Sequence, residues 1–265
     1  MDMDKKKLLI TMGDSVTEGV GCYDYSKMSK MVPYSSLDHN ERIYQTNRFH
    51  ELGWPNRLGK KLNYDRVINI GLGGTGQSAH VKLFFEKILP QDLSEYDVLV
   101  VWLLTEPSRF SFYCNGVIKS FQPDYSDDAN ELSSAYFKQI FDLYNDSILE
   151  TIFYIKTIEQ VCQNNNFNLQ ITSWDFHSLR RIFKIHRSNS EMIDVFNNSF
   201  LKINSNLDEY TSLVCSHPNE KGYEILSEAM FDSIRKHKPE YINKNKTSNL
   251  EWQWIGSPIK WKNII

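Results

Sequence analysis

The stretch LLITMGDSVTEGVG, residues 8–21, combines a short apolar run with an abrupt change to small and acidic residues. A half-buried surface strand would alternate apolar and polar residues, and an amphipathic helix would repeat an apolar residue every three or four positions. The run does neither, so it predicts a buried strand that ends in a tight turn. That turn would present one hydroxyl group, the side chain of Ser15, at its tip.

Further apolar runs predict more strands, and helical patterns lie between them. Alternation of strands and helices is typical of a parallel sheet with helices on both faces. We therefore expect an α/β protein, a three-layer α/β/α sandwich with a central parallel sheet. The expected strands cover 7–12, 66–70, 97–104, 168–174 and 211–214, and the expected helices cover 54–62, 76–89, 130–163, 190–203 and 218–237.

The length of 265 residues, with 41% hydrophobic and 24% charged residues, fits one α/β domain with long loops. We expect this domain over 1–240, with aromatic loop insertions over 22–53 and 107–129, and a Trp-rich tail over 241–265. Long loops after strands are usually functional, so both insertions are expected to wall a cleft. The tail either packs back on the domain or offers residues 250–265 for self-association or a partner contact.

Charge and composition exclude several classes of function. A formal net charge of -3 and the lack of a long basic cluster give no reason to expect binding to nucleic acid. No segment approaches the ~20 apolar residues of a membrane span, and the amino-terminal residues make a poor signal peptide. The scattered cysteines contain no CxxC pair and predict reduced thiols. These features favour a cytoplasmic protein, with association with a virion as the alternative.

Three segments at the predicted carboxyl ends of strands carry chemistry, and ligands bind at such ends in parallel sheets. The first is the turn with Ser15. The second is NIGLGGTG, residues 69–76, whose glycines let the backbone approach a ligand and leave N–H groups free to face it. The third holds His217, just before the last helix, and a histidine can take the proton of a serine hydroxyl. Each segment alone is a weak signal, but their order and placement make a stronger joint one.

Together these segments resemble the sequence blocks of the SGNH (GDSL-like) hydrolase family, over residues 8 to about 237. The resemblance implies that Ser15 in GDSVTEG is the nucleophile and that His217 in HPNEKGYEIL is the general base. It also implies that Gly74 in NIGLGG forms the oxyanion hole together with the N–H group of Ser15. The implied fold is the flavodoxin-like three-layer sandwich, and the implied reaction is hydrolysis of acyl esters, often acetyl groups on sugars or lipids. The expected partner is a small-molecule or glycan ester, and no cofactor or metal is expected.

The third block of the family departs from its pattern here. It normally presents an asparagine after the third strand, whose side chain donates to the oxyanion, but Glu106 falls at that position. A carboxylate there would oppose the developing negative charge. Thr105 and Arg109 are the candidate replacements as donors, and Glu106, Tyr23 and Phe110 are expected to line the substrate cleft.

The triad acid is the second departure. The family places this acid three residues before the histidine, where the present chain has Val214. Asp208 and Asp175 are the candidates to supply the carboxylate from elsewhere. The acid is otherwise absent or replaced by a main-chain carbonyl.

Two other functions compete with the serine esterase. GLGGTG, residues 71–76, also matches the dinucleotide fingerprint GxGxxG. However, it follows the second predicted strand and not the first. The acidic residue at the end of the next strand, Glu106, also lies further from the motif than the usual ~20 residues. The stronger rival is a catalytically impaired carbohydrate-binding or virion structural protein that keeps the hydrolase fold. The altered third block, the missing acid and the Trp-rich tail favour that alternative.

Overall fold

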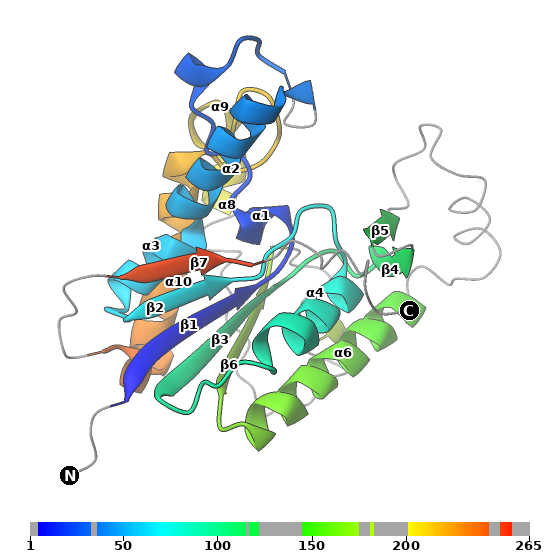
Figure 1. The fold of residues 1–265 in the computed structure, drawn as a ribbon, viewed down its shortest axis with the longest axis vertical. Helices are drawn as coiled ribbons and strands as arrows, with labels where there is room; N and C mark the ends of the chain where they lie inside the picture. Colours follow the sequence, from blue (N-terminus) through cyan, green and yellow to red (C-terminus); the bar gives the residue numbers. More distant parts are fainter. Residues whose placement is uncertain are drawn as a thin grey trace.

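The computed structural model describes residues 5–32, 36–114, 117–121, 145–174, 181–182, 201–243 and 250–255. Five strands form one parallel sheet in the order β6-β3-β1-β2-β7 (Figure 1). These strands are β1 (Lys6–Met12), β2 (Arg66–Asn69), β3 (Tyr96–Leu104), β6 (Asn168–Ser173) and β7 (Glu251–Trp254). An antiparallel pair outside that sheet consists of β4 (Phe110–Cys114) and β5 (Val117–Phe121).

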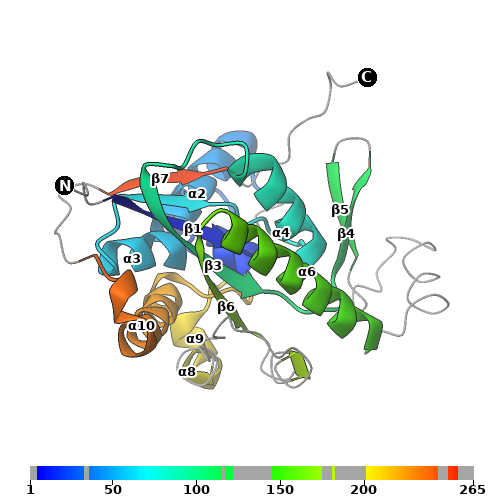
Figure 2. The same ribbon diagram turned by 90° about the horizontal axis from the view of Figure 1, so that it is seen from below.

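Helices cover both faces of the sheet, as Figure 2 shows from below. The described helices are α1 (Ser15–Glu18), α2 (His39–Leu52), α3 (Trp54–Lys61), α4 (Gln77–Leu83), α6 (Asn145–Asn164), α8 (Leu201–Ser205), α9 (Leu207–Tyr210) and α10 (Glu220–His237). A π-helical turn (Phe84–Ile88) continues α4, and 3₁₀ turns cover Tyr25–Lys27 and Pro239–Tyr241. The arrangement is the expected three-layer α/β/α sandwich.

Strand β1 shows why the opening apolar run does not alternate. Leu8 and Ile10 pack in a cluster with α4 and α6, while Leu9, between them, packs in a second cluster with α3 and α10. All three side chains have no exposed surface. Successive strand residues face opposite sides, so a strand buried on both faces must be apolar at every position.

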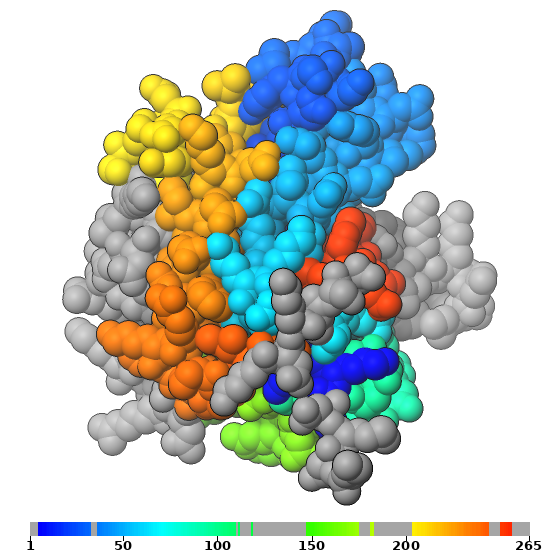
Figure 3. Space-filling model, turned by 90° about the vertical axis from the view of Figure 1, so that its left-hand side faces the viewer, coloured from blue at the N-terminus to red at the C-terminus, as the bar shows by residue number. Residues whose placement is uncertain are grey.

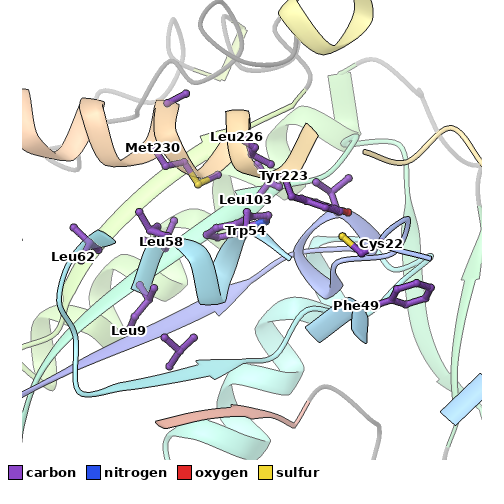
Figure 4. Close-up of a cluster of buried hydrophobic side chains, with 14 of the residues drawn as sticks. Leu9, Cys22, Phe49, Trp54, Leu58, Leu62, Leu103, Tyr223, Leu226 and Met230 are labelled. Carbon is purple, nitrogen blue, oxygen red and sulfur yellow. The ribbon is translucent and has the colours of Figure 1, made fainter. Parts of the chain in front are cut away.

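The second of these clusters joins the sheet to the helices on one face (Figure 4). Trp54 and Leu58 of α3 share this cluster with Leu226 and Met230 of α10, and Leu103 of β3 lies between Trp54 and Leu226. Pro55 stands in the first turn of α3, where its missing N–H group costs no hydrogen bond. Burial of this cluster fixes α10, whose first turn follows directly after His217.

The predicted strand over 211–214 is wrong. Thr211 makes only an isolated bridge to Pro218, and Leu213 is 71% exposed, so the short run TSLV has no sheet face to bury. The fifth strand is instead β7, which comes from the Trp-rich tail and pairs in parallel with β2. Residues 250–255 therefore pack back on the sheet.

The two stretches expected to be irregular contain regular structure. Within 22–53 the chain forms the helix α2, which begins at a capping box in which Asp38 and Glu41 each accept from the other's backbone N–H group. Within 107–129 the described residues form the β4–β5 hairpin. Residues 122–144 and 183–200, which include much of two predicted helices, lie outside the described residues.

No helix in the part of the chain that the structure describes is long and apolar enough to cross a membrane.

The two-sided burial of β3 predicts a large cost for truncating its core side chains. Leu103→Ala should lower the free energy of unfolding by about 2–5 kcal/mol, because it removes fully buried atoms and leaves a cavity. Leu149→Ala is the control, since Leu149 is 56% exposed on α6, and it should change stability by less than about 0.5 kcal/mol. Urea unfolding followed by circular dichroism measures both. Equal stabilities for the two variants would contradict the assigned core.

Candidate active site

Ser15 stands at the turn between β1 and α1, as the opening stretch predicts. Asp14 is the N-cap of α1, and its carboxylate Oδ1 accepts from the backbone N–H group of Val16 at 3.0 Å. The capping bond places Ser15 in the first position of the helix, with its side chain largely buried.

His217 meets Ser15 across 202 positions of sequence: its Nε2 lies 2.7 Å from the Ser15 Oγ. The backbone carbonyl of His217 accepts from the N–H group of Ser212 at 2.9 Å. Two residues later, Asn219 caps α10 by accepting from the N–H groups of Lys221 and Gly222. These bonds hold the histidine in a short loop between two anchored points.

Gly21 allows the two segments to come this close. Its φ of +120° is rarely adopted by residues with a side chain. A Cβ atom at Gly21 would lie 2.2 Å from the carbonyl oxygen of Pro218 and 3.0 Å from the Cβ of His217. Any larger residue at this position would therefore push the histidine loop away from Ser15.

The glycine loop after β2 lies against Ser15. Asn69 anchors its start, because its Oδ1 accepts from the N–H group of Gly71 and its Nδ2 donates to the carbonyl oxygen of Thr17. A Cβ atom built on Gly73 would come within 3.4 Å of the Ser15 Cβ. Gly74 has a φ of +73° and faces open space. Within the described residues, no hydrogen bond uses the backbone N–H groups of Ser15 or Gly74.

Glu18 holds this loop from the side of α1, a role that the sequence analysis did not find. Its Oε2 accepts from the N–H group of Gly73 at 2.7 Å. The sequence around Glu18 contains no pattern that predicts this contact, because Gly73 lies 55 positions away.

A buried chain of hydrogen bonds holds the loop from beneath. The indole Nε1 of Trp102 donates to Nδ1 of His80 at 3.2 Å, so the imidazole proton sits on Nε2 and is donated to the Thr75 hydroxyl at 3.1 Å. Thr75 in turn donates to the carbonyl oxygen of Leu72. Burial lowers the pKa of His80 to about 4, so this imidazole is neutral at neutral pH.

Asp14 also organises the loop after β3. Its Oδ2 accepts from the Thr105 hydroxyl at 2.8 Å and from a guanidinium N–H group of Arg109 at 3.1 Å. The guanidinium carbon of Arg109 lies 5.6 Å from the centre of the Trp174 ring, and its buried Nε has no partner among the described residues. Thr105 has one hydroxyl proton, which it donates to Asp14, whereas Arg109 keeps further N–H donors.

The third group of a triad is missing from the described part of the site. The Nδ1 atom of His217 is buried and has no partner there. Asp208 is exposed on α9 and makes no contact with His217, and Asp175 lies outside the described residues. The thiol of Cys215 lies beside His217. Burial raises the pKa of this thiol, but its interactions with His217 and Ser212 lower the pKa by more, so the net shift is downward.

The three residues expected to line the cleft lie in different environments. Tyr23 does not line it, because its ring is buried in the core, 4.9 Å from the ring of Phe49 in an edge-to-face contact. Glu106 is half-buried at the end of β3, where it accepts from the Ser108 hydroxyl at 2.6 Å. The backbone of Phe110 begins β4, and its side chain lies outside the described part.

Over the described ranges, no group of three or more His, Cys, Asp or Glu side chains is arranged to hold a metal ion. The site brings a serine hydroxyl within hydrogen-bond distance of an imidazole, next to backbone N–H groups that have no partner among the described residues.

No protein-family model and no curated protein matches the sequence. Solved structures are similar in fold. A protein assigned to the G-D-S-L lipolytic family, from Desulfitobacterium hafniense DCB-2, matches with a TM-score of 0.51 at 13% identity, over 86% of this chain and 99% of that chain. An acetyl xylan esterase matches with a TM-score of 0.47 at 14% identity, over 86% of this chain and 99% of that chain. A gut microbial diltiazem-metabolizing enzyme matches with a TM-score of 0.43 at 14% identity, over 88% of this chain and 48% of that chain. The first match shows that the chain has the SGNH-hydrolase-like α/β fold.

The buried neutral His80 predicts a loss of stability in acid. The unfolded chain binds a proton at this histidine below a pH of about 6.5, whereas the native chain does so only near pH 4. The free energy of unfolding should therefore fall by about 2–3 kcal/mol from this group between pH 7 and pH 4.5. His80→Gln cannot titrate, so its urea midpoint should depend less on pH than that of the wild type.

His39→Gln is the matched control, because His39 is exposed at the start of α2, and it should keep the wild-type pH dependence. An unchanged acid sensitivity in His80→Gln would contradict the assignment of His80 as a buried neutral group.

Proposed function

We propose that the protein is a serine ester hydrolase of the SGNH type, acting on acyl esters, acetyl esters foremost, of carbohydrate or lipid-like alcohols. One observation carries the proposal, the 2.7 Å contact between the Ser15 Oγ and the His217 Nε2. An imidazole at this distance can act as general base for the hydroxyl, which is too weak a nucleophile on its own.

In the acylation step, the Ser15 Oγ attacks the carbonyl carbon of the ester while its proton moves to Nε2 of His217. The carbonyl oxygen becomes an oxyanion in the tetrahedral intermediate. When that intermediate collapses, the bond to the alcohol oxygen breaks, and the proton passes from Nε2 to the departing alcohol. The product of this step is an acyl ester on Ser15.

In the deacylation step, water takes the place of the alcohol. Nε2 of His217 accepts a proton from the water as its oxygen attacks the acyl carbon, and then returns that proton to the Ser15 Oγ. The carboxylic acid leaves and the serine hydroxyl is restored. Both steps use the same contact between the two side chains.

The oxyanion would be stabilised by the backbone N–H groups of Ser15 and Gly74. Both are free of partners within the described residues, and the loop that carries Gly74 is held by Glu18 and by the His80 chain. Donors that are fixed before the reaction need no reorganisation as charge develops. Arg109 is a better candidate for a third donor than Thr105, because it has further N–H groups besides the one that donates to Asp14, whereas the single hydroxyl proton of Thr105 is donated to Asp14.

The Nδ1 atom of His217, which has no partner among the described residues, predicts a slow enzyme. In serine proteases, a histidine that loses its carboxylate partner reduces kcat by about 10⁴, because the ring is no longer held in the correct tautomer. A Ser–His pair without that partner would still use its oxyanion donors and its bound geometry.

The same unpartnered atom, together with Glu106 at the asparagine position, favours a second candidate function. A carbohydrate-binding protein, including a structural protein of a virion, could keep this fold with an impaired site. This candidate predicts ligand binding without turnover of any ester, whereas the esterase requires turnover that depends on Ser15.

Hydrolysis of p-nitrophenyl acetate tests the esterase directly. Ser15→Ala should reduce turnover to the uncatalysed rate, because no oxygen remains to form the acyl-enzyme, and its melting temperature should stay nearly unchanged. His217→Ala should reduce kcat by at least about 10³, since the general base is lost. Comparison with p-nitrophenyl octanoate measures the preference for a short acyl group.

Phe153→Ala serves as the control, because Phe153 is exposed on α6 and has no part in the site. Wild-type turnover no faster than that of Ser15→Ala would remove the esterase and leave the binding protein. Faster turnover of the octanoate ester would overturn the preference for acetyl.

A further inference from the structure

A pocket of about 400 Å³ lies between α2 and β7, and none of its lining residues belongs to the site described around Ser15. Figure 3 shows these two elements on one face of the molecule, α2 in blue and β7 in red. The pocket is lined by His39, Arg42, Ile43, Thr46, Asn47, His50, Trp252 and Trp254. A volume of this size suits a ligand of one or two rings.

The lining residues of α2 recur every three or four positions, so they form one stripe along the helix. Phe49 and Gln45, on a neighbouring stripe, are buried in the interior. The pocket stripe is different, because Ile43 in its middle is 49% exposed. This face of the helix therefore packs on the sheet only at its end, through His50, and is open at Ile43.

The opposite wall is aromatic. Trp252 and Trp254 are two positions apart in a strand, so they share one face of β7. The Trp254 ring stacks on His50 at 4.2 Å, with an angle of 18° between the planes, and is held in place. Trp252 is 41% exposed and offers a broad indole surface to the pocket.

The polar groups around the indole decide which ligand fits. The amide of Asn47 and the imidazole of His39 have no hydrogen-bond partner in the described structure, and Arg42 adds a guanidinium group to the same wall. A pyranose ring has an apolar C–H face that stacks on an indole and hydroxyl groups at its rim that pair with such donors and acceptors. An alkyl chain would leave these polar groups covered and unpaired, which is costly.

The pocket is linked directly to the loop beside Ser15. The Trp254 Nε1 donates to the carbonyl oxygen of Gly71 at 2.8 Å. The His50 Nε2 lies 4.0 Å from Oε1 of Glu18, whose other oxygen accepts from Gly73. Glu18 and Ser15 are the two ends of α1, about 4.5 Å apart along its axis. The pocket thus adjoins both the glycine loop and α1, the two elements that flank Ser15.

We infer that this pocket is a subsite for a pyranose ring in the alcohol part of the substrate. The role of the subsite in catalysis rests on the proposed function, but sugar binding itself does not. The inference narrows the substrate class to carbohydrate esters and excludes the lipid-like alcohols.

Isothermal titration calorimetry of the Ser15→Ala protein, which cannot turn over an ester, tests the subsite. The probes are xylohexaose, cellohexaose and N-acetylchitohexaose. At least one should bind with a Kd of about 1 mM or tighter. Adding Trp252→Ala should raise that Kd by about tenfold or more, whereas Trp252→Phe, which keeps an aromatic face, should raise it less. Asn47→Ala should weaken binding several-fold, and Phe153→Ala should leave it unchanged.

Failure of all three sugars to bind, or binding that is indifferent to both Trp252→Ala and Asn47→Ala, would overturn the inference. Competition by octanoate for the same site would also overturn it. The two proposals are tested separately. Hydrolysis of p-nitrophenyl acetate by the wild-type protein reports on the esterase alone, because this substrate carries no sugar, whereas calorimetry of the Ser15→Ala protein reports on the subsite alone. The exposed control Phe153→Ala should leave both results unchanged.

Discussion

The parallel pairing of β1 with β2 and β3 is the constraint on which the site depends. Thr11 pairs with Asn69 and Met12 with Trp102, so the three strands end at one edge of the sheet. The turn with Ser15, the glycine loop and the loop after β3 therefore leave the sheet side by side. A slip of one residue would turn every buried side chain of β1 to the opposite layer, where it does not fit. Burial of β1 on both faces thus fixes the position of Ser15 at that edge of the sheet.

Polar contacts hold the loops at that edge, and the number of contacts differs from loop to loop. The carboxylate of Asp14 receives three donors and links the first turn of α1 to the loop after β3. The glycine loop is held through Glu18 on one side and His80 on the other. His217 has no comparable support, because one ring nitrogen contacts Ser15 and the other has no partner within the described residues. The loops beside Ser15 are thus held by several side-chain hydrogen bonds, whereas the ring of His217 is held only through its contact with Ser15 among the described residues.

The sequence predicts the sandwich because periodicity is a local property of strands and helices buried in a core. The meeting of Ser15 with His217 was also expected, but the strand predicted before His217 is absent, and the loop before α10 carries the histidine to Ser15 instead. The sequence left open whether the Trp-rich tail packs back on the domain. The parallel pairing of β7 with β2 was not predictable, because pairing with a strand so distant along the chain leaves no local pattern. The contacts of Glu18 and His80 were missed for a similar reason: a hydrogen bond to a distant backbone leaves no pattern in the chain.

Labelling with a fluorophosphonate tests the central claim most directly, because this probe reacts with a serine only when a neighbouring base activates its hydroxyl. The account predicts that the native protein is modified at Ser15 alone, as identified by mass spectrometry of its peptides. The unfolded protein and a His217→Ala protein of native circular dichroism should both stay unmodified. A native, folded wild-type protein whose Ser15 remains unlabelled after prolonged exposure would contradict the account.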